Sequence, residues 1–152
     1  DVDKPGSKNL FYYIFLNIKK NWDKKYFIEL ESNYTTSRTL LPEELKGQLE
    51  EDIKNFSCSF KQRLFLKKTI NIIFLTEYFS NNINTPGNAS FIFIDAECNF
   101  KIPHSSFFAS VKAANLTNEK FYYLLDNQVL NQSFTTVPLI RRNVLFSLRY
   151  QF

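Results

Sequence analysis

The sequence predicts an all-β fold of antiparallel, up-and-down strands that are long enough to cross a membrane. Three observations predict it: apolar and polar side chains alternate with a period of two, most alternating segments run nine residues or more, and the connections alternate in length. Successive side chains of a strand point to opposite faces, so this period separates an apolar face from a polar one. A tilted strand crosses a bilayer with about 9–11 residues, more than a soluble strand usually has.

The first four predicted strands are residues 8–19, 25–36, 54–67 and 69–80. The first and the fourth are apolar on both faces over most of their length, and only Asn17 and Glu77 indicate which face is polar. The second and third alternate more clearly, because polar residues occupy every second position. These polar residues are Glu29, Glu31 and Asn33 in the second strand, and Ser57, Ser59, Lys61, Arg63 and Lys67 in the third.

The last three predicted strands are residues 89–102, 105–116 and 143–152. The first of them alternates apolar residues with Asp95, Glu97, Asn99 and Lys101, and the second alternates Phe107, Ala109 and Val111 with Ser110 and Lys112. The final strand alternates most cleanly. Its even positions are all apolar or aromatic, namely Val144, Phe146, Leu148, Tyr150 and Phe152.

The connections between these strands are short and long in turn. The short ones are 19–25, 67–69 and 102–105, and the longer ones are 37–53, 81–88 and 117–142. An up-and-down barrel in an outer membrane has tight turns at its periplasmic rim and longer loops outside. A final strand that descends to the periplasm would place every long connection on the outside. The loop 42–53 begins with Pro42 and two acids and spaces Leu45, Leu49 and Ile53 by four, which predicts a short helix there.

Composition excludes several classes. The chain is 44% hydrophobic, which excludes a disordered protein, and no apolar stretch approaches the length of a transmembrane helix. Its net charge of +4 is mild, and Lys and Arg never occur in runs longer than a pair, so we expect no nucleic-acid partner. Cys58 and Cys98 allow one disulfide or two free thiols equally, and their spacing is not that of metal ligands.

Three segments resemble one known family. Asn84-Thr85-Pro86-Gly87 precedes an acid-bearing strand. Ala114-Asn115-Leu116-Thr117-Asn118-Glu119-Lys120-Phe121-Tyr122-Tyr123 follows, and the third segment is Arg142-Asn143 with the strand that ends at Phe152. In this order they are similar to the end of TonB-dependent outer-membrane receptors, particularly those of Bacteroidota. The matching motif is carried by Asn115, Leu116, Thr117, Asn118, Tyr122 and Tyr123, whereas residues 1–81 carry no motif of their own.

The resemblance implies a barrel of about 22 strands around a plug domain, in the bacterial outer membrane. Residues 1–152 would then be the C-terminal portion of that barrel, with the plug domain absent, and the whole receptor would import a nutrient such as a siderophore or glycan. Its partners would be outer-membrane lipid, the plug, a TonB-type energy transducer and the barrel-assembly machinery. The assembly machinery would recognise Val144, Phe146, Leu148, Tyr150 and Phe152. The substrate and its binding residues stay unknown.

Other features have less specific interpretations. Ten charged residues mostly face one way by alternation and form a polar barrel interior or, alternatively, line a substrate path: Glu29, Glu31, Lys61, Arg63, Glu77, Asp95, Glu97, Lys101, Lys112 and Arg149. Tyr122 and Tyr123 fit an outer aromatic girdle better than a ligand contact. Asn-X-Ser/Thr sequons at Asn33, Asn55, Asn88, Asn115 and Asn131 are attributed to an Asn-rich chain, because three fall inside predicted strands.

We expect no enzyme, no cofactor and no metal site. The lone histidine, His104, precedes Ser105, but the predicted topology puts this pair on a periplasmic turn, away from an outer-leaflet substrate. Two other classes of function remain open. One is a small stand-alone barrel with a structural or adhesive role, which would need an even number of strands. The other is a soluble secreted β-sandwich that serves as an interaction module.

Overall fold

The structure is a computed structural model that describes residues 8–23, 25–40, 52–82, 89–128 and 131–151. Nine strands and no helix occur in these residues. The strands are β1 (Lys8–Trp22), β2 (Tyr26–Leu40), β3 (Asp52–Lys67), β4 (Ile70–Asn82), β5 (Ala89–Lys101), β6 (Phe107–Ala114), β7 (Phe121–Gln128), β8 (Asn131–Pro138) and β9 (Asn143–Tyr150).

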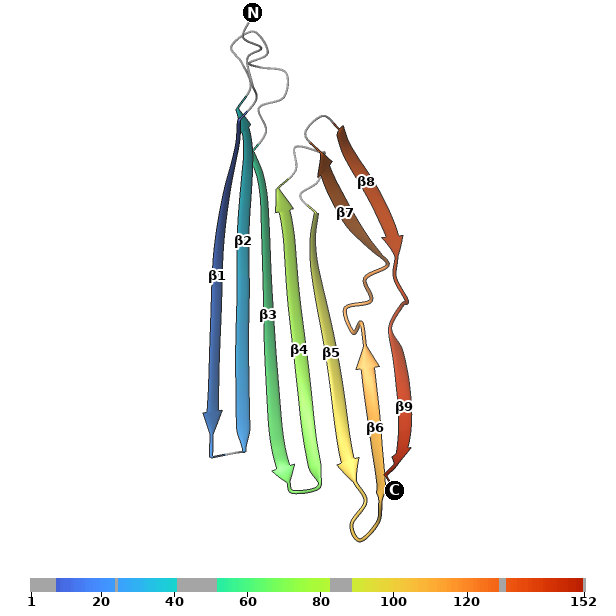
Figure 1. Ribbon diagram of the computed structural model, residues 1–152. Coiled ribbons are helices and arrows are strands. Elements are labelled where there is room, and N and C mark those ends of the chain that lie inside the picture. The colour runs from blue at the N-terminus through green and yellow to red at the C-terminus, as the bar shows by residue number, and fades with distance from the viewer. Residues whose placement is uncertain (1–7, 24, 41–51, 83–88, 129–130, 152) are drawn as a thin grey trace, which may run out of the picture.

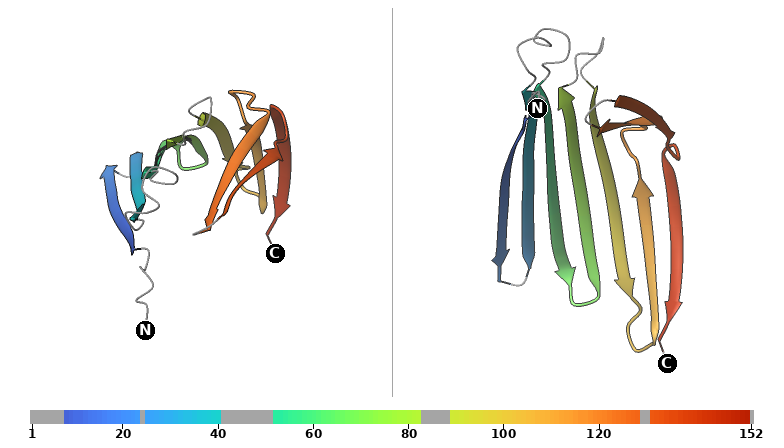
Figure 2. Two further views of the ribbon diagram at one scale, coloured as in Figure 1. Left: turned by 90° about the horizontal axis from the view of Figure 1, so that it is seen from above. Right: turned by 45° about the horizontal axis from the view of Figure 1, so that its top comes forward.

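Seven of the described strands form one antiparallel sheet in the order β1-β2-β3-β4-β5-β6-β9 (Figure 1). Each strand pairs with its neighbour along the chain, except that β9 returns to pair with β6. Seen from above, the sheet curves into an arc (Figure 2). Strands β1 and β9 are its two edges, each paired on one side within the described residues. The predicted all-β, antiparallel, up-and-down fold is confirmed.

All seven predicted strands are present, with shifted ends. Strands β1 and β2 continue to Trp22 and Leu40, beyond the predicted ends at 19 and 36, because ladder hydrogen bonds between backbones need no particular side chain. Strand β6 is shorter than predicted. It starts after the turn at Ser105, whose hydroxyl accepts a hydrogen bond from the Phe107 N–H (3.2 Å), and it stops before Asn115, where φ is +54°.

The segment 117–142 was predicted as a loop, and this prediction is wrong for part of it. Strands β7 and β8 pair within it as an antiparallel hairpin (Figure 1). The hairpin escaped notice because 121–125 is apolar or aromatic at every position and shows no alternation. The helix predicted over 42–53 lies outside the described residues up to position 51, and residues 52 and 53 already belong to β3.

The short turns lie at one end of the sheet, the lower end in Figure 1, and the ends of β2, β3, β4 and β5 that the longer connections join lie at the other. We call these the turn end and the loop end. The β1–β2 turn closes with a hydrogen bond from the Lys25 N–H to the Trp22 carbonyl (2.9 Å), and Asp23 sits in the left-handed region with φ +47°. Asp and Asn tolerate this region better than most residues. The predicted sorting of connections by length is confirmed.

Within the described residues, no second layer of strands or helices covers either face of the sheet, so the sheet has almost no buried core. Among the described side chains, Phe91 is the one buried hydrophobic residue, at 7% exposure, whereas Ile14 and Phe146 are 63% and 80% exposed. A soluble sandwich buries such side chains against a second sheet. No helix in the described ranges has the length and apolar character needed to span a membrane.

Candidate functional site

The sheet has two chemically distinct faces, and the strand register keeps each of them continuous from one strand to the next. Even-numbered residues of β1 to β5 and β9 share a face with odd-numbered residues of β6. A central row on this face runs Ile18, Leu30, Phe60, Thr76, Ile94, each residue opposite the next. We call it the apolar face and the opposite one the polar face.

The middle of the apolar face has no charge among the side chains that the structure describes. Its described charges are Lys20, close to the turn end, and Arg38 and Lys54, close to the loop end. Cys58 and Cys98 are both free thiols on this face, each on the third strand from an edge of the sheet. The uncharged band therefore extends through all seven strands of the main sheet.

Aromatic rings border the uncharged band at both ends. Two ring pairs lie near the turn end and one lies near the loop end. They are Trp22–Tyr26 and Phe107–Tyr150, with ring centroids 5.6 Å and 4.9 Å apart, and Phe56–Tyr78, with centroids 6.0 Å apart. The Tyr26 hydroxyl also donates to Gln62 Oε1 at 2.9 Å. Each pair joins neighbouring strands of the sheet.

The polar face carries all ten charged residues that alternation assigned to one side. They interact across strands. Lys19 pairs with Glu29, and the Lys112 ammonium lies 3.0 Å from Asp95 Oδ2. One row runs Lys19, Glu29, Lys61 over β1, β2 and β3, so charges of opposite sign alternate along it. Opposite-charge pairs directly across strands stabilise a sheet, whereas like charges do not.

Amide side chains extend this network along the polar face. Asn17 Nδ2 donates to Glu31 Oε1 at 2.6 Å, and Asn99 Nδ2 donates to Glu97 Oε1 at 2.7 Å. The Nε of Arg63 is buried, without a hydrogen-bond partner, and its guanidinium carbon lies 6.0 Å from the ring centroid of Phe65. Asn17 and Glu31 lie on adjacent strands, as do Asn99 and Asn71, whose side chains are hydrogen-bonded at 3.3 Å, so this part of the network depends on the register.

The polar face also holds an aromatic cluster toward the loop end. Phe79 and Phe93 meet edge to face with centroids 6.0 Å apart, and Phe91 stacks 6.4 Å from Phe93. On β1, the Tyr13 hydroxyl donates to Asn33 Oδ1 at 2.9 Å. The aromatic cluster thus adjoins the charged network, with Phe93 directly opposite Glu77, and alternation alone did not reveal the cluster.

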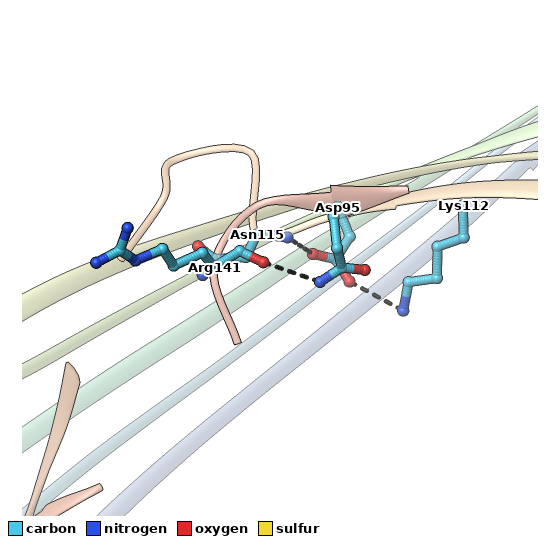
Figure 3. Close-up of polar contacts among 5 residues, drawn as sticks. Asp95, Lys112, Asn115 and Arg141 are labelled. Atoms are coloured by element: carbon cyan, nitrogen blue, oxygen red, sulfur yellow. Dashed lines mark hydrogen bonds and ion pairs between the residues drawn. The ribbon is translucent and has the colours of Figure 1, made fainter. Parts of the chain in front are cut away.

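Asn115 ties the β7–β8 hairpin to the sheet, and it is the one buried polar residue among the described side chains, at 9% exposure. Its backbone N–H donates to Asp95 Oδ1 at 2.9 Å, and Figure 3 shows Lys112 reaching the same carboxylate. Asp95 therefore joins β5, β6 and the residue that follows β6. A carboxylate shared by a backbone N–H and an ammonium makes charge-assisted hydrogen bonds on both sides.

The Asn115 side chain binds the residues on both sides of the hairpin base. Its Nδ2 donates to the carbonyls of Glu119, before β7, and Ile140, after β8, at 2.8 Å and 2.9 Å. Its Oδ1 accepts the Glu119 N–H at 2.9 Å. Asn118, at φ +61°, accepts the Arg142 N–H at 3.2 Å. We call this set of contacts the hairpin clamp.

The structure places the other predicted residues as follows. Val144, Phe146, Leu148 and Tyr150 share the apolar face of β9, and Phe152 lies outside the described residues. Tyr122 and Tyr123 lie in β7. Their predicted place in an aromatic girdle stays a prediction. Leu116 and Thr117 are exposed beside the clamp.

The remaining candidates are the His104–Ser105 pair, the sequons and any metal ligands. The Ser105 hydroxyl donates to the Ile102 carbonyl at 3.1 Å, so the turn uses it structurally beside His104. Asn33 and Asn115 are engaged by Tyr13 and by the clamp, and Asn55 lies within β3, which suits glycosylation poorly. No group of three or more potential metal ligands occurs in the described ranges.

Comparison with known proteins adds no identity. No protein-family model, no curated protein and no solved structure matches the chain. The interpretation of the two faces and the hairpin clamp therefore depends on their own geometry and chemistry.

Proposed function

We propose that this chain is part of the wall of a bacterial outer-membrane β-barrel, the C-terminal wall of a receptor that imports a nutrient such as a siderophore or glycan. The observation that carries the proposal is the apolar face: one uncharged band that continues through seven strands and is bordered by aromatic rings. Lipid-facing surfaces of barrels have this composition, with aromatic girdles at the headgroups.

The lipid bilayer supplies the layer that the apolar face lacks. Removing apolar side chains from water stabilises by about 25 cal/mol per Å². Side chains as exposed as Ile14 and Phe146 obtain this stabilisation only if something covers them. The polar face, with its cross-strand ion pairs, then faces a lumen that holds water or a plug domain, where charged side chains are tolerated.

The two open edge strands favour a barrel with more strands than the seven of the described sheet. Strands β1 and β9 each present one row of backbone groups without a strand partner in the described residues. Inside hydrocarbon such groups cost several kcal/mol each, so barrels close completely. In the proposed receptor, further strands complete the barrel, and a plug domain with a TonB-type energy transducer drives import.

The intact mass of the native polypeptide that carries this sequence tests the proposal. We expect it in a detergent-extracted outer-membrane fraction, with a mass several times 18.0 kDa and this stretch at its C-terminus. A mass near 18.0 kDa in that fraction would replace the receptor with a small barrel. Recovery without detergent would remove the membrane placement altogether.

We also propose that the barrel-assembly machinery binds the apolar side chains of β9, among them Phe146 and Leu148. Phe146→Asp and Leu148→Asp are expected to reduce the amount of membrane-inserted protein at least about tenfold, because a charge at a lipid-facing position opposes insertion. The measurement is the heat-modifiable band of the native polypeptide in outer-membrane fractions. Ser147→Asp, between them on the polar face, is the matched control and should leave insertion unchanged. Equal insertion of all three variants would contradict this role.

A further inference from the structure

Lysines gather at the turn end of the sheet. Lys25 lies in the β1–β2 turn, Lys67 and Lys68 lie at the β3–β4 turn, and Lys101 ends β5, and all four are exposed. Within the turns that the structure describes, Asp23 is the one acidic residue. The turn end therefore carries an excess of positive charge.

Backbone hydrogen bonds join these turns into a continuous rim. The Phe65 N–H donates to the Lys25 carbonyl at 2.8 Å, which holds the β1–β2 turn against the end of β3. The Lys101 N–H donates to the Thr69 carbonyl at 2.8 Å, which holds the β3–β4 turn against the end of β5. The lysines are thus carried by neighbouring, mutually fixed segments rather than by independent loops.

An aromatic pair lies directly beside this rim, on the apolar face. Trp22 stacks on Tyr26, and the Lys20 ammonium lies 5.8 Å from the Trp22 ring centroid. Trp and Tyr prefer the headgroup level of a membrane, and a lysine near the end of a membrane segment extends its ammonium toward the headgroups. The aromatic pair therefore marks the height at which headgroups meet the sheet, and the lysine rim lies at that height.

We propose that the turn-end rim of Lys25, Lys67 and Lys68, with Lys20 beside Trp22, binds anionic phospholipids of the adjacent leaflet through their phosphates. This inference rests on the proposed membrane placement and adds a lipid preference to it. Lysine is a point charge suited to phosphate, and juxtamembrane lysines are attracted to anionic lipid surfaces. The charge, the aromatic marker and the adjoining apolar face all match a lipid headgroup layer.

Trp22 fluorescence in vesicles tests the inference. The native polypeptide is reconstituted into phosphatidylcholine vesicles that contain one quarter phosphatidylglycerol, with bromine on the acyl chains of one lipid or the other. Bromine quenches a nearby tryptophan, and the difference between the wild type and Trp22→Phe isolates the signal of Trp22. We expect phosphatidylglycerol to be enriched about fivefold at Trp22 at low salt, the effect of about one lysine at an anionic surface. High salt should abolish the enrichment.

Two charge-matched variants locate the effect. Lys25→Gln/Lys67→Gln/Lys68→Gln should reduce the enrichment toward one, because it removes three of the turn-end charges. Lys54→Gln/Lys120→Gln/Arg141→Gln removes the same charge from positions away from the turn end and should leave the enrichment at the wild-type value. Each substituted residue is exposed, and in Figure 3 the Arg141 guanidinium points away from the clamp, so both variants should fold.

The outcomes separate this inference from the proposed function. Quenching that is equal for both brominated lipids would overturn the lipid preference and leave the membrane placement intact. An enrichment that persists in the turn-end variant would also overturn it. Absence of quenching by either lipid would place Trp22 away from acyl chains and overturn the membrane placement itself.

Discussion

Arginine in place of Phe60 is expected to destabilise the protein in bilayers by about 2–4 kcal/mol. Phe60 lies halfway along β3, in the central row of the apolar face between Leu30 and Thr76. An arginine at the bilayer midplane of a barrel costs about 2–4 kcal/mol. The measurement is urea-induced unfolding of the native polypeptide in phosphatidylcholine vesicles, in which the Phe60→Arg variant should lose about that much free energy of unfolding.

The residue before Phe60 provides a matched control. Ser59 lies on the polar face, between Glu31 of β2 and Glu77 of β4 in the same row. An arginine at position 59 has two carboxylates on the neighbouring strands, so Ser59→Arg should be neutral or slightly stabilising. The two variants introduce the same side chain one residue apart, and their difference isolates the lipid-facing placement.

Equal stability of Phe60→Arg and Ser59→Arg in vesicles would contradict a lipid-facing apolar face. A larger loss for Ser59→Arg would mean that the two faces are assigned the wrong way round. Because the same strand pairing holds for both positions, neither result could be explained by β-propensity alone.

Alanine in place of Asn115 is expected to release the β7–β8 hairpin from the sheet. The change leaves the carbonyls of Glu119 and Ile140 and the N–H of Glu119 without their partner, at a cost of about 1–3 kcal/mol for buried groups. Alanine also tolerates the left-handed φ of +54° less well than asparagine, whose short polar side chain can hydrogen-bond locally. Hydrogen exchange of the β7 and β8 amides should therefore accelerate by at least about a hundredfold.

Glycine at position 115 separates the two costs. Glycine adopts positive φ freely but makes no side-chain hydrogen bond, so Asn115→Gly should lie between the wild type and Asn115→Ala. Exchange in β2 and β3, distant from the clamp, serves as the internal control and should not change. If the hairpin amides exchange at the wild-type rate in Asn115→Ala, the clamp does not hold the hairpin.

The main sheet could be predicted from the sequence because its evidence is local. In 25–36 and 143–152, polar and apolar residues alternate strictly enough to reveal both the strand and the composition of its faces. The ten charged residues share the polar face because side chains alternate along each strand and the register sets polar positions of neighbouring strands opposite one another. The lengths of the connections likewise indicated which of them lie together at each end.

The candidate site depended on contacts that alternation does not encode. The pairing of Lys19 with Glu29 and the meeting of Phe79 with Phe93 both require a particular register between strands. The hairpin escaped prediction because a segment that is apolar on both faces has no phase to read. Asn115 was noticed as part of a motif, but its role in the clamp requires Asp95 and Ile140 to come within hydrogen-bond distance of it.

The sequence by itself therefore determined the strands, their two faces and the ends at which their connections lie, since each follows from side chains a few residues apart. Only the tertiary structure decided the register, the open edges at β1 and β9, the hairpin and its clamp. These depend on which strands lie side by side, and that choice is made by hydrogen bonds and packing between residues far apart in the chain.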